Sequence, residues 1–189
     1  MDSSKAILRK KYLERRKNMN FHDCFIQSIS AQQRFLGSKY YLESKVIGLY
    51  YPILNEVQTF KIMSEALLNS KTICLPTIVD DQICFFQYDP TKNLRNGKYG
   101  ILEPERTCEN MNSFLDIVIT PGVVFDLKGS RIGYGKGYYD KFFNSNDIKF
   151  ITRVGLGYDF QLILEKIPSN ALDVKMNILI SDKRMINMS

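Results

Sequence analysis

One stretch of the sequence limits the fold more than any other: an apolar run that leads through a glycine-rich loop into a tyrosine-rich segment. Residues 115–122 ("LDIVITPG") have the composition of a buried strand. Five of the eleven glycines lie between residues 122 and 137, and three of them alternate within "RIGYGKGYYDKFF" (131–143). The "GYYDKFFNS" run then indicates a helix. A strand, a glycine loop and a helix in this order are typical of an α/β domain, in which ligands bind outside the carboxyl ends of the strands.

The rest of the chain alternates between strand-like and helix-like segments. The pattern predicts helices at 3–17, 22–36, 59–70 and 159–168, and strands at 45–52, 71–78, 82–88, 150–158 and 176–181. Strands that alternate with helices predict a mostly parallel α/β sheet. The sequence has no internal repeat and no linker, so we expect a single domain over residues 1–189.

Composition excludes several classes of protein. No apolar run reaches the roughly 20 residues of a transmembrane helix, and the N-terminal residues have no apolar signal-peptide core. We therefore expect a soluble, cytoplasmic protein without membrane partners. The single histidine, His22, argues against a Ser-His-Asp or Cys-His hydrolase and against a zinc site. The four cysteines form no CxxC motif, and we expect free thiols in a reducing compartment: Cys24, Cys74, Cys84 and Cys108.

The glycine loop has the make-up of a phosphate-binding element. Glycines let backbone N–H groups approach an anion closely, while Arg131 and Lys136 can neutralise phosphate oxygens. Asp140 follows where a carboxylate can hold Mg²⁺ against those phosphates. The motif is neither a Walker loop nor a dinucleotide fingerprint. A second interpretation is a purely structural glycine hairpin before a helix, with Tyr138 and Tyr139 in the core.

Positive charge is concentrated at the N-terminus. Residues 1–17 have a net charge of +5, within +6 for the whole chain. On a helix, Lys5, Arg9, Tyr12 and Arg16 share one stripe. Three interpretations remain open: a solvated helix face, a nucleic-acid surface, or a helix from which Lys5 and Arg9 reach over the sheet edge to ATP.

Taken together and in chain order, these segments resemble the 5-formyltetrahydrofolate cyclo-ligase family. The most specific match is "DIVITPGVVFDLKGSRIGYGKGYYDKFF" (116–143), which is similar to the family signature of a strand, Pro-Gly, Phe-Asp and Arg-x-Gly-x-Gly-x-Gly-Tyr-Tyr-Asp. Supporting matches are "KAILRKKYLERR", "YYPILNEVQT", "ICLPTI", "YGILEPE", "VGLGYDFQLI" and "IPSNALDVKMN". One departure within the signature is Tyr134, at a position where members vary and some have arginine.

The resemblance implies a fold and a reaction. The fold is a three-layer α/β structure of the NagB/RpiA/CoA transferase-like type, with a mostly parallel sheet flanked by helices and a basic N-terminal helix. The reaction is the ATP- and Mg²⁺-dependent closure of 5-formyltetrahydrofolate to 5,10-methenyltetrahydrofolate, with release of ADP and phosphate. The implied partner is this small-molecule folate, with or without a polyglutamate tail. We expect a monomer that binds no nucleic acid.

The resemblance also assigns site residues. It implies catalytic roles for Arg131 and Lys136 and metal binding by Asp140 and Asp173. The implied ATP-binding residues are Lys5, Arg9, Arg131, Gly133, Tyr134, Gly135, Lys136, Gly137, Tyr138 and Tyr139. The implied substrate-binding residues are Tyr51, Glu56, Tyr134, Gly135, Lys136, Gly137 and Tyr138.

Other interpretations accompany these roles. Glu56 and Asp140 are also the acidic residues that favour a helix N-terminus, and Asp173 has the character of a cap. For the whole chain, the alternatives are a nucleic-acid-binding module that uses the basic helix and a phosphate-binding enzyme of different chemistry, such as a relative of acyl- or CoA-transferases. The spacing from Arg131 to Asp140 favours the cyclo-ligase.

Overall fold

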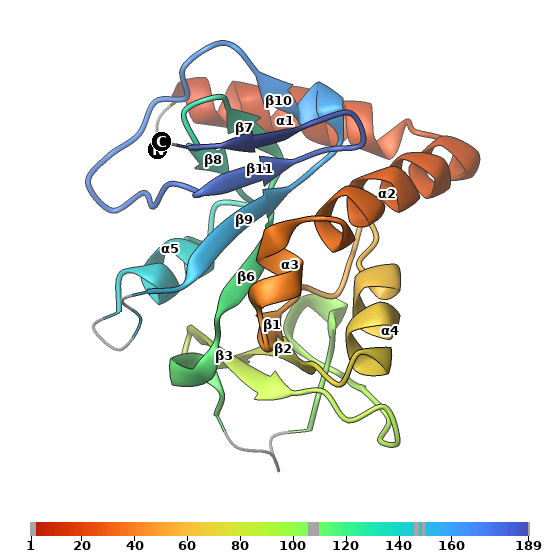
Figure 1. Ribbon diagram of the computed structural model, residues 1–189. Coiled ribbons are helices and arrows are strands. Elements are labelled where there is room, and N and C mark those ends of the chain that lie inside the picture. The colour runs from red at the N-terminus through yellow and green to blue at the C-terminus, as the bar shows by residue number, and fades with distance from the viewer. Residues whose placement is uncertain (1–2, 106–109, 146–147, 149, 189) are drawn as a thin grey trace.

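The computed structural model describes residues 3–105, 110–145, 148 and 150–188, and a seven-stranded sheet forms its centre (Figure 1). The strand order is β12-β11-β9-β6-β1-β2-β3. The strands from β11 to β2 in this order run parallel to one another, and β12 and β3 pair antiparallel at the two edges. The sheet strands are β1 (Val46–Gly48), β2 (Thr72–Val79), β3 (Gln82–Gln87), β6 (Ile117–Pro121), β9 (Thr152–Leu156), β11 (Ile178–Ile180) and β12 (Met185–Asn187). The predicted mostly parallel sheet is confirmed.

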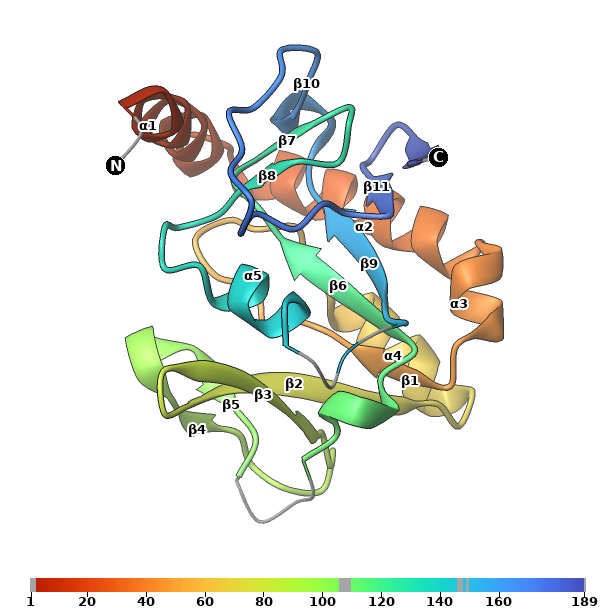
Figure 2. The same ribbon diagram turned by 90° about the vertical axis from the view of Figure 1, so that its left-hand side faces the viewer.

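Two layers cover the sheet, one on each face (Figure 2). Helices α2 (Phe21–Leu36), α3 (Lys39–Glu43) and α4 (Phe60–Leu68) lie on one face. The other face carries α5 (Tyr138–Phe143) and a small sheet of β7 (Val124–Asp126), β8 (Arg131–Ile132) and β10 (Leu162–Ile163), beside which α1 (Ser3–Lys17) lies. Shorter elements are β4 (Arg95–Asn96), β5 (Leu102–Glu103) and 3₁₀ turns at Lys98–Gly100, Asn112–Phe114 and Asp159–Gln161. The three-layer expectation is confirmed.

The apolar strands read as continuous runs because both faces of the sheet are buried. In β6, Ile117 and Ile119 point to the core beneath α2 and α4, while Val118 between them packs with Phe125 and Phe142 on the opposite face. The same alternation in β11 sends Ile178 and Ile180 one way and Leu179 the other.

Helix boundaries follow local signals. The α1 helix has the predicted bounds, and α2 begins one residue earlier than predicted, where the Asn20 side chain accepts a hydrogen bond from the Asp23 N–H. Gly37 ends α2, as the sequence predicts. Cys24 and Cys74 are buried free thiols and Cys84 is a half-buried one; Cys108 lies outside the described residues. None of the described helices is both long and apolar enough to cross a bilayer.

The predicted helix at 159–168 is wrong. A single 3₁₀ turn is followed by β10, which pairs in parallel with β7. Leu162 and Ile163 are both buried, and they belong to different apolar clusters on either side of the strand. Consecutive residues reach opposite sides in a strand but not in a helix, so burial of both side chains overrides the local helical pattern.

Candidate active site

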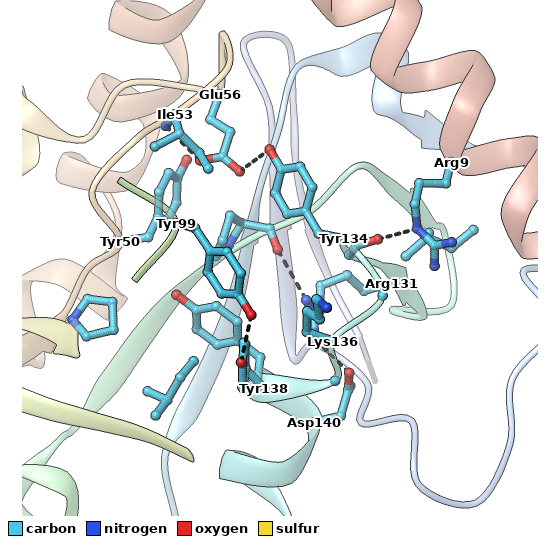
Figure 3. A pocket seen from close by; sticks show the side chains of 18 of the residues that line it. Arg9, Tyr50, Ile53, Glu56, Tyr99, Arg131, Tyr134, Lys136, Tyr138 and Asp140 are labelled. Carbon is cyan, nitrogen blue, oxygen red and sulfur yellow. Dashed lines mark hydrogen bonds and ion pairs between the residues drawn. The ribbon is translucent and has the colours of Figure 1, made fainter. Parts of the chain in front are cut away.

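A cavity of about 760 Å³ lies at the carboxyl ends of β1, β2 and β6. Its volume is in the range of small-molecule sites, which span about 300–1,000 Å³. The lining comes from α1, the segment after β1, the β2–β3 hairpin, the turn at Lys98–Gly100, the glycine loop and residues 168–173. Figure 3 shows the side chains that meet there.

Every residue that the sequence analysis assigned to the site lines this cavity. They are Lys5, Arg9, Tyr51, Glu56, Arg131, Gly133, Tyr134, Gly135, Lys136, Gly137, Tyr138, Tyr139, Asp140 and Asp173. The fold thus brings together four segments that are far apart in the sequence. Tyr138 and Tyr139 also pack against the core, so these two side chains combine the structural and the site interpretation.

The glycine loop joins β8 to α5 and needs backbone conformations that glycine permits. Gly135 and Gly137 have φ values of 97° and 68°, in the left-handed region. The α5 helix that follows is only six residues long. The cations around the loop, rather than a helix dipole, therefore carry the attraction for an anion.

Arg131 is held at the base of the loop between β6 and α5. Its side chain is only 5% exposed, and one terminal nitrogen lies 3.1 Å from Asp140 Oδ2. The other donates to the Pro121 carbonyl at 3.4 Å. Arg131 Nε is buried and has no hydrogen-bond partner among the described residues. A cation with unused donor capacity in the cavity wall fits a site that receives phosphate oxygens.

The α1 helix supplies two more cations to the cavity, Lys5 and Arg9. Their contacts rule out the interpretation of this stripe as a solvated helix face. Lys5 Nζ lies 2.6 Å from Asp173 Oδ2, and Arg9 Nε donates to the Gly133 carbonyl at 2.7 Å. A solvated helix face is therefore wrong for this stripe. Burial alone would raise the pKa of Asp173, but the hydrogen bonds from Lys5 and the Asn170 N–H and the charge of Lys5 lower it.

Glu56 forms the other end of the site and is 4% exposed. The Ile53 N–H donates to Oε2 at 3.0 Å, and the Tyr134 hydroxyl donates to Oε1 at 3.1 Å (Figure 3). Burial raises the Glu56 pKa, against the opposing effects of the Arg16 charge and these two hydrogen bonds. Two carboxylate oxygens offer about four acceptor positions, so Glu56 keeps capacity for a ligand donor. Tyr51 lines the cavity nearby and packs edge-on against Phe60.

Arg16 also belongs to the site, although it was not predicted as a site residue. Its side chain is 1% exposed, and NH1 lies 4.0 Å from Glu56 Oε1. The guanidinium also donates to the Tyr134 hydroxyl. The sequence feature that could have indicated this role is the helical stripe that Arg16 shares with Lys5 and Arg9.

A second group that was not predicted lies at the edge of the cavity, where Lys98, Tyr99 and Tyr138 line it. Tyr138 donates a hydrogen bond to Asp81 at 2.8 Å, and the Tyr99 hydroxyl lies 3.1 Å from that of Tyr138. Lys98 and Lys141 pair with the same Asp81 carboxylate. The hydrogen bonds with Tyr99 and Asp81 raise the Tyr138 pKa. Asp81 and Tyr99 stand in turn-rich segments, where the sequence alone gave no reason to expect a contact.

Asp140 and Asp173 both line the cavity and lie on segments that contact each other. The contact is a hydrogen bond of 3.2 Å from the Val174 N–H to Asp140 Oδ1. Within the described part of the chain, no cluster of three or more acidic, histidine or cysteine side chains is suited to a metal. Mg²⁺ bound with a nucleotide takes only one or two protein carboxylates, and phosphate and water complete its shell. The donor set fits that mode of binding.

Comparisons with known proteins identify relatives of this chain. Residues 1–182 match the model of the 5-formyltetrahydrofolate cyclo-ligase family. A 5-formyltetrahydrofolate cyclo-ligase from Haemophilus influenzae is 31% identical over 139 residues, which cover 71% of this chain and 74% of the relative. The NMR structure of 5,10-methenyltetrahydrofolate synthetase from Aquifex aeolicus is similar with a TM-score of 0.85 and 32% identity, covering 97% of this chain and 92% of that one.

A 5,10-methenyltetrahydrofolate synthetase from Mycoplasma pneumoniae has a TM-score of 0.75 and 25% identity, covering 96% of this chain and 99% of that one. The sequence family and the fold therefore lead to the same conclusion. The chain belongs to the 5-formyltetrahydrofolate cyclo-ligase family.

Proposed function

We propose that the protein converts 5-formyltetrahydrofolate to 5,10-methenyltetrahydrofolate, with consumption of ATP in the presence of Mg²⁺ and release of ADP and phosphate. One observation carries this proposal: a single cavity has a buried carboxylate, Glu56, at one end and the cations of α1 and the glycine loop at the other. The first suits a ligand with N–H donors and the second suits a polyphosphate.

At the cationic end, Lys5, Arg9, Arg131 and Lys136 surround the glycine loop. ATP is consumed in the reaction and is therefore a second substrate. We assign its phosphates to this loop, where Gly133, Gly135 and Gly137 leave the backbone open and Tyr134, Tyr138 and Tyr139 form walls of the cavity. Arg131 and Lys136 stabilise the charge that develops on the transferred phosphoryl group, the usual source of catalysis in such reactions.

The reaction requires activation of a poor leaving group. The formyl oxygen forms a bond to the γ-phosphorus while the bond from that phosphorus to ADP breaks. The N10 lone pair then attacks the formyl carbon, the carbon–oxygen bond breaks with release of phosphate, and N10 loses its proton. The residues of the cavity hold the two substrates in the geometry for both steps.

Mg²⁺, when bound with the nucleotide, neutralises phosphate charge. Asp140 and Asp173 are the carboxylates that would hold it. Each now faces a cation, Arg131 and Lys5 respectively, so both basic side chains are also placed to turn from a carboxylate to a phosphate oxygen.

At the other end, Glu56 accepts hydrogen bonds from the N–H groups of the pterin ring, and Tyr51 and Tyr134 form the adjoining walls. The residues from Gly135 to Tyr138 face the folate from the glycine loop. The ligand is a small-molecule folate, with or without a polyglutamate tail, and the reaction needs no nucleic acid or membrane. We expect a cytoplasmic monomer.

The test is a turnover assay. The protein is incubated with 5-formyltetrahydrofolate, ATP and Mg²⁺, and the absorbance of the methenyl product is followed together with released phosphate. We expect one phosphate for each methenyl group formed and no product when ATP is omitted. Product without ATP, or ATP hydrolysis without product, would refute the proposed reaction.

A further inference from the structure

Arg16 is a buried cation that contacts the site without lining the cavity. Its side chain is 1% exposed, yet it donates to the Tyr134 hydroxyl and lies 4.0 Å from Glu56 Oε1. The Arg16 guanidinium also lies 5.7 Å from the centre of the Tyr134 ring. A fully buried arginine is rare unless it is paired, and here the partners are two residues that line the cavity.

The groups around the Glu56 carboxylate are mostly neutral, and Arg16 is charged. The groups that face Glu56 are the Ile53 N–H, the hydroxyl of Tyr134 and, at longer range, the phenols of Tyr50 and Tyr139. The Tyr158 hydroxyl meets the Glu56 backbone carbonyl at 3.3 Å. Among the described residues, Arg16 is the one cation in an ion pair with Glu56. Removal of that cation would leave a buried carboxylate among neutral groups, a state in which it protonates readily.

We propose that Arg16 is a positioning residue for folate recognition: it keeps Glu56 ionised and holds the Tyr134 hydroxyl against Glu56 Oε1. This inference rests on the proposed function and deepens it. Arg16 touches neither substrate and acts through Glu56 and Tyr134.

The same helix then serves both ends of the site. Arg9 reaches the glycine loop and Lys5 reaches Asp173 from the first turns of α1, and Arg16 reaches Glu56 from its last turn. The rise along the helix axis from Lys5 to Arg16 is about 16 Å, so one helix contacts groups at two separate parts of the site. The α1 helix therefore contacts both binding ends.

A purely structural role is the competing explanation. Arg16 also donates to the carbonyls of Leu54 at 3.0 Å and Gly122 at 3.3 Å, and these bonds fasten α1 to two loops. Loss of such bonds lowers stability but leaves the protonation of Glu56 unchanged. The pH dependence of folate binding therefore separates the two roles.

The experiment measures the Kd for 5-formyltetrahydrofolate by calorimetry between about pH 5 and 9, with and without a non-hydrolysable ATP analogue. The variants are Arg16→Gln, Arg16→Lys and the matched control Arg15→Gln, whose guanidinium is exposed and lies over Phe160. In the wild type, affinity falls as the pH drops and Glu56 protonates. We expect Arg16→Gln to raise the Kd at neutral pH by about 10- to 100-fold and to move the midpoint of the pH profile upward.

Arg16→Lys keeps the positive charge, so its midpoint stays near that of the wild type although its affinity is lower. Arg15→Gln should have the same affinity for the folate and the same midpoint of the pH profile as the wild type. An Arg16→Gln protein with reduced affinity but an unchanged midpoint would overturn the proposal in favour of the structural role.

A double variant keeps the proposal testable if Arg16→Gln does not fold. Glu56→Gln combined with Arg16→Gln leaves no uncompensated buried charge. With Glu56 neutral, only the hold of Arg16 on the Tyr134 hydroxyl is lost, so the double variant should bind the folate within about tenfold of Glu56→Gln alone; a larger further loss would overturn the proposal. A wild-type protein that binds no 5-formyltetrahydrofolate under either condition would overturn the proposed function itself, and this inference with it.

Discussion

Among the described residues that line the cavity, Lys136 is the cation with neither a hydrogen bond nor an ion pair, whereas Arg9 donates to the Gly133 carbonyl. Arg131 and Lys5 form ion pairs with Asp140 and Asp173, whereas Lys136 is exposed and forms none among the described residues; its ammonium lies 6.0 Å from the centre of the Tyr99 ring. The Lys136 ammonium can therefore move onto a phosphate oxygen without breaking an ion pair. This freedom makes it the side chain best suited to follow a phosphoryl group during transfer.

We predict that Lys136→Ala lowers kcat by roughly 100-fold and leaves the melting temperature nearly unchanged, because an exposed side chain contributes little to stability. Lys128→Ala is the matched control, an exposed lysine in the turn between β7 and β8 that does not line the cavity. Unchanged turnover in Lys136→Ala would remove this residue from the chemistry.

The ion pair between Lys5 and Asp173 predicts a pH-dependent contribution to stability. The folded-state pKa of Asp173 is lowered, so the stabilisation is present above the unfolded value of about 4 and is lost as the pH falls through the folded pKa. Because both side chains are partly exposed, we expect Asp173→Asn to lower the free energy of unfolding by only about 1 kcal/mol at neutral pH. Urea unfolding at neutral and acidic pH measures the difference in the free energy of unfolding between the wild type and Asp173→Asn. This difference should disappear in acid; a difference of constant size would contradict this assignment.

The α1 helix directs one stripe of basic side chains into the protein, and its other basic side chains are exposed. Lys5 and Arg9 line the cavity, while Lys10 and Lys17 face solvent. The helix thus contributes to the site by the direction of particular side chains and not by its total charge.

This arrangement predicts a difference between two double variants of equal charge. Lys5→Ala with Arg9→Ala should raise the Kd for ATP by about tenfold or more and change the Kd for the folate less. Lys10→Ala with Lys17→Ala removes the same charge and should leave both constants close to those of the wild type. Equal weakening of ATP binding by the two variants would show that only net charge matters.

The glycine loop and the segment before it need glycine for different reasons. Gly137 has a φ of 68°, and a Cβ added to it would have no atom within 4 Å, so alanine there meets only backbone strain. At Gly122, a Cβ would lie 2.4 Å from the Phe125 ring, in the core of the fold.

We predict that Gly137→Ala lowers the free energy of unfolding by about 1 kcal/mol, whereas Gly122→Ala lowers it by about 1–3 kcal/mol or more through overpacking. Urea unfolding of the two variants shows directly which one loses more free energy of unfolding. A larger loss for Gly137→Ala than for Gly122→Ala would contradict the close packing of Gly122 against Phe125.

For the whole molecule, the sequence predicts what depends on local pattern. The parallel sheet follows from apolar runs such as 115–122, and the proposed roles of Arg131, Lys136 and Asp140 follow from the motif around the glycine loop. Tyr51, Glu56 and Asp173 lie outside that motif, and only the family resemblance pointed to them. The contacts of Arg16 and Asp81 are not predictable in this way, because they join segments that are distant in the chain: Arg16 to Glu56, and Asp81 to Tyr138. The strand β10 was missed for the same reason, since its pairing with β7 is decided by tertiary burial.

The central claim is that ATP and the folate share one cavity, with the triphosphate at the glycine loop. A crystal structure of the protein with Mg²⁺ and a non-hydrolysable ATP analogue tests it most directly. We predict triphosphate density against residues 131–137 and within reach of Lys5 and Arg9, with Glu56 left free for the folate. An empty glycine loop with the triphosphate bound elsewhere would contradict the account.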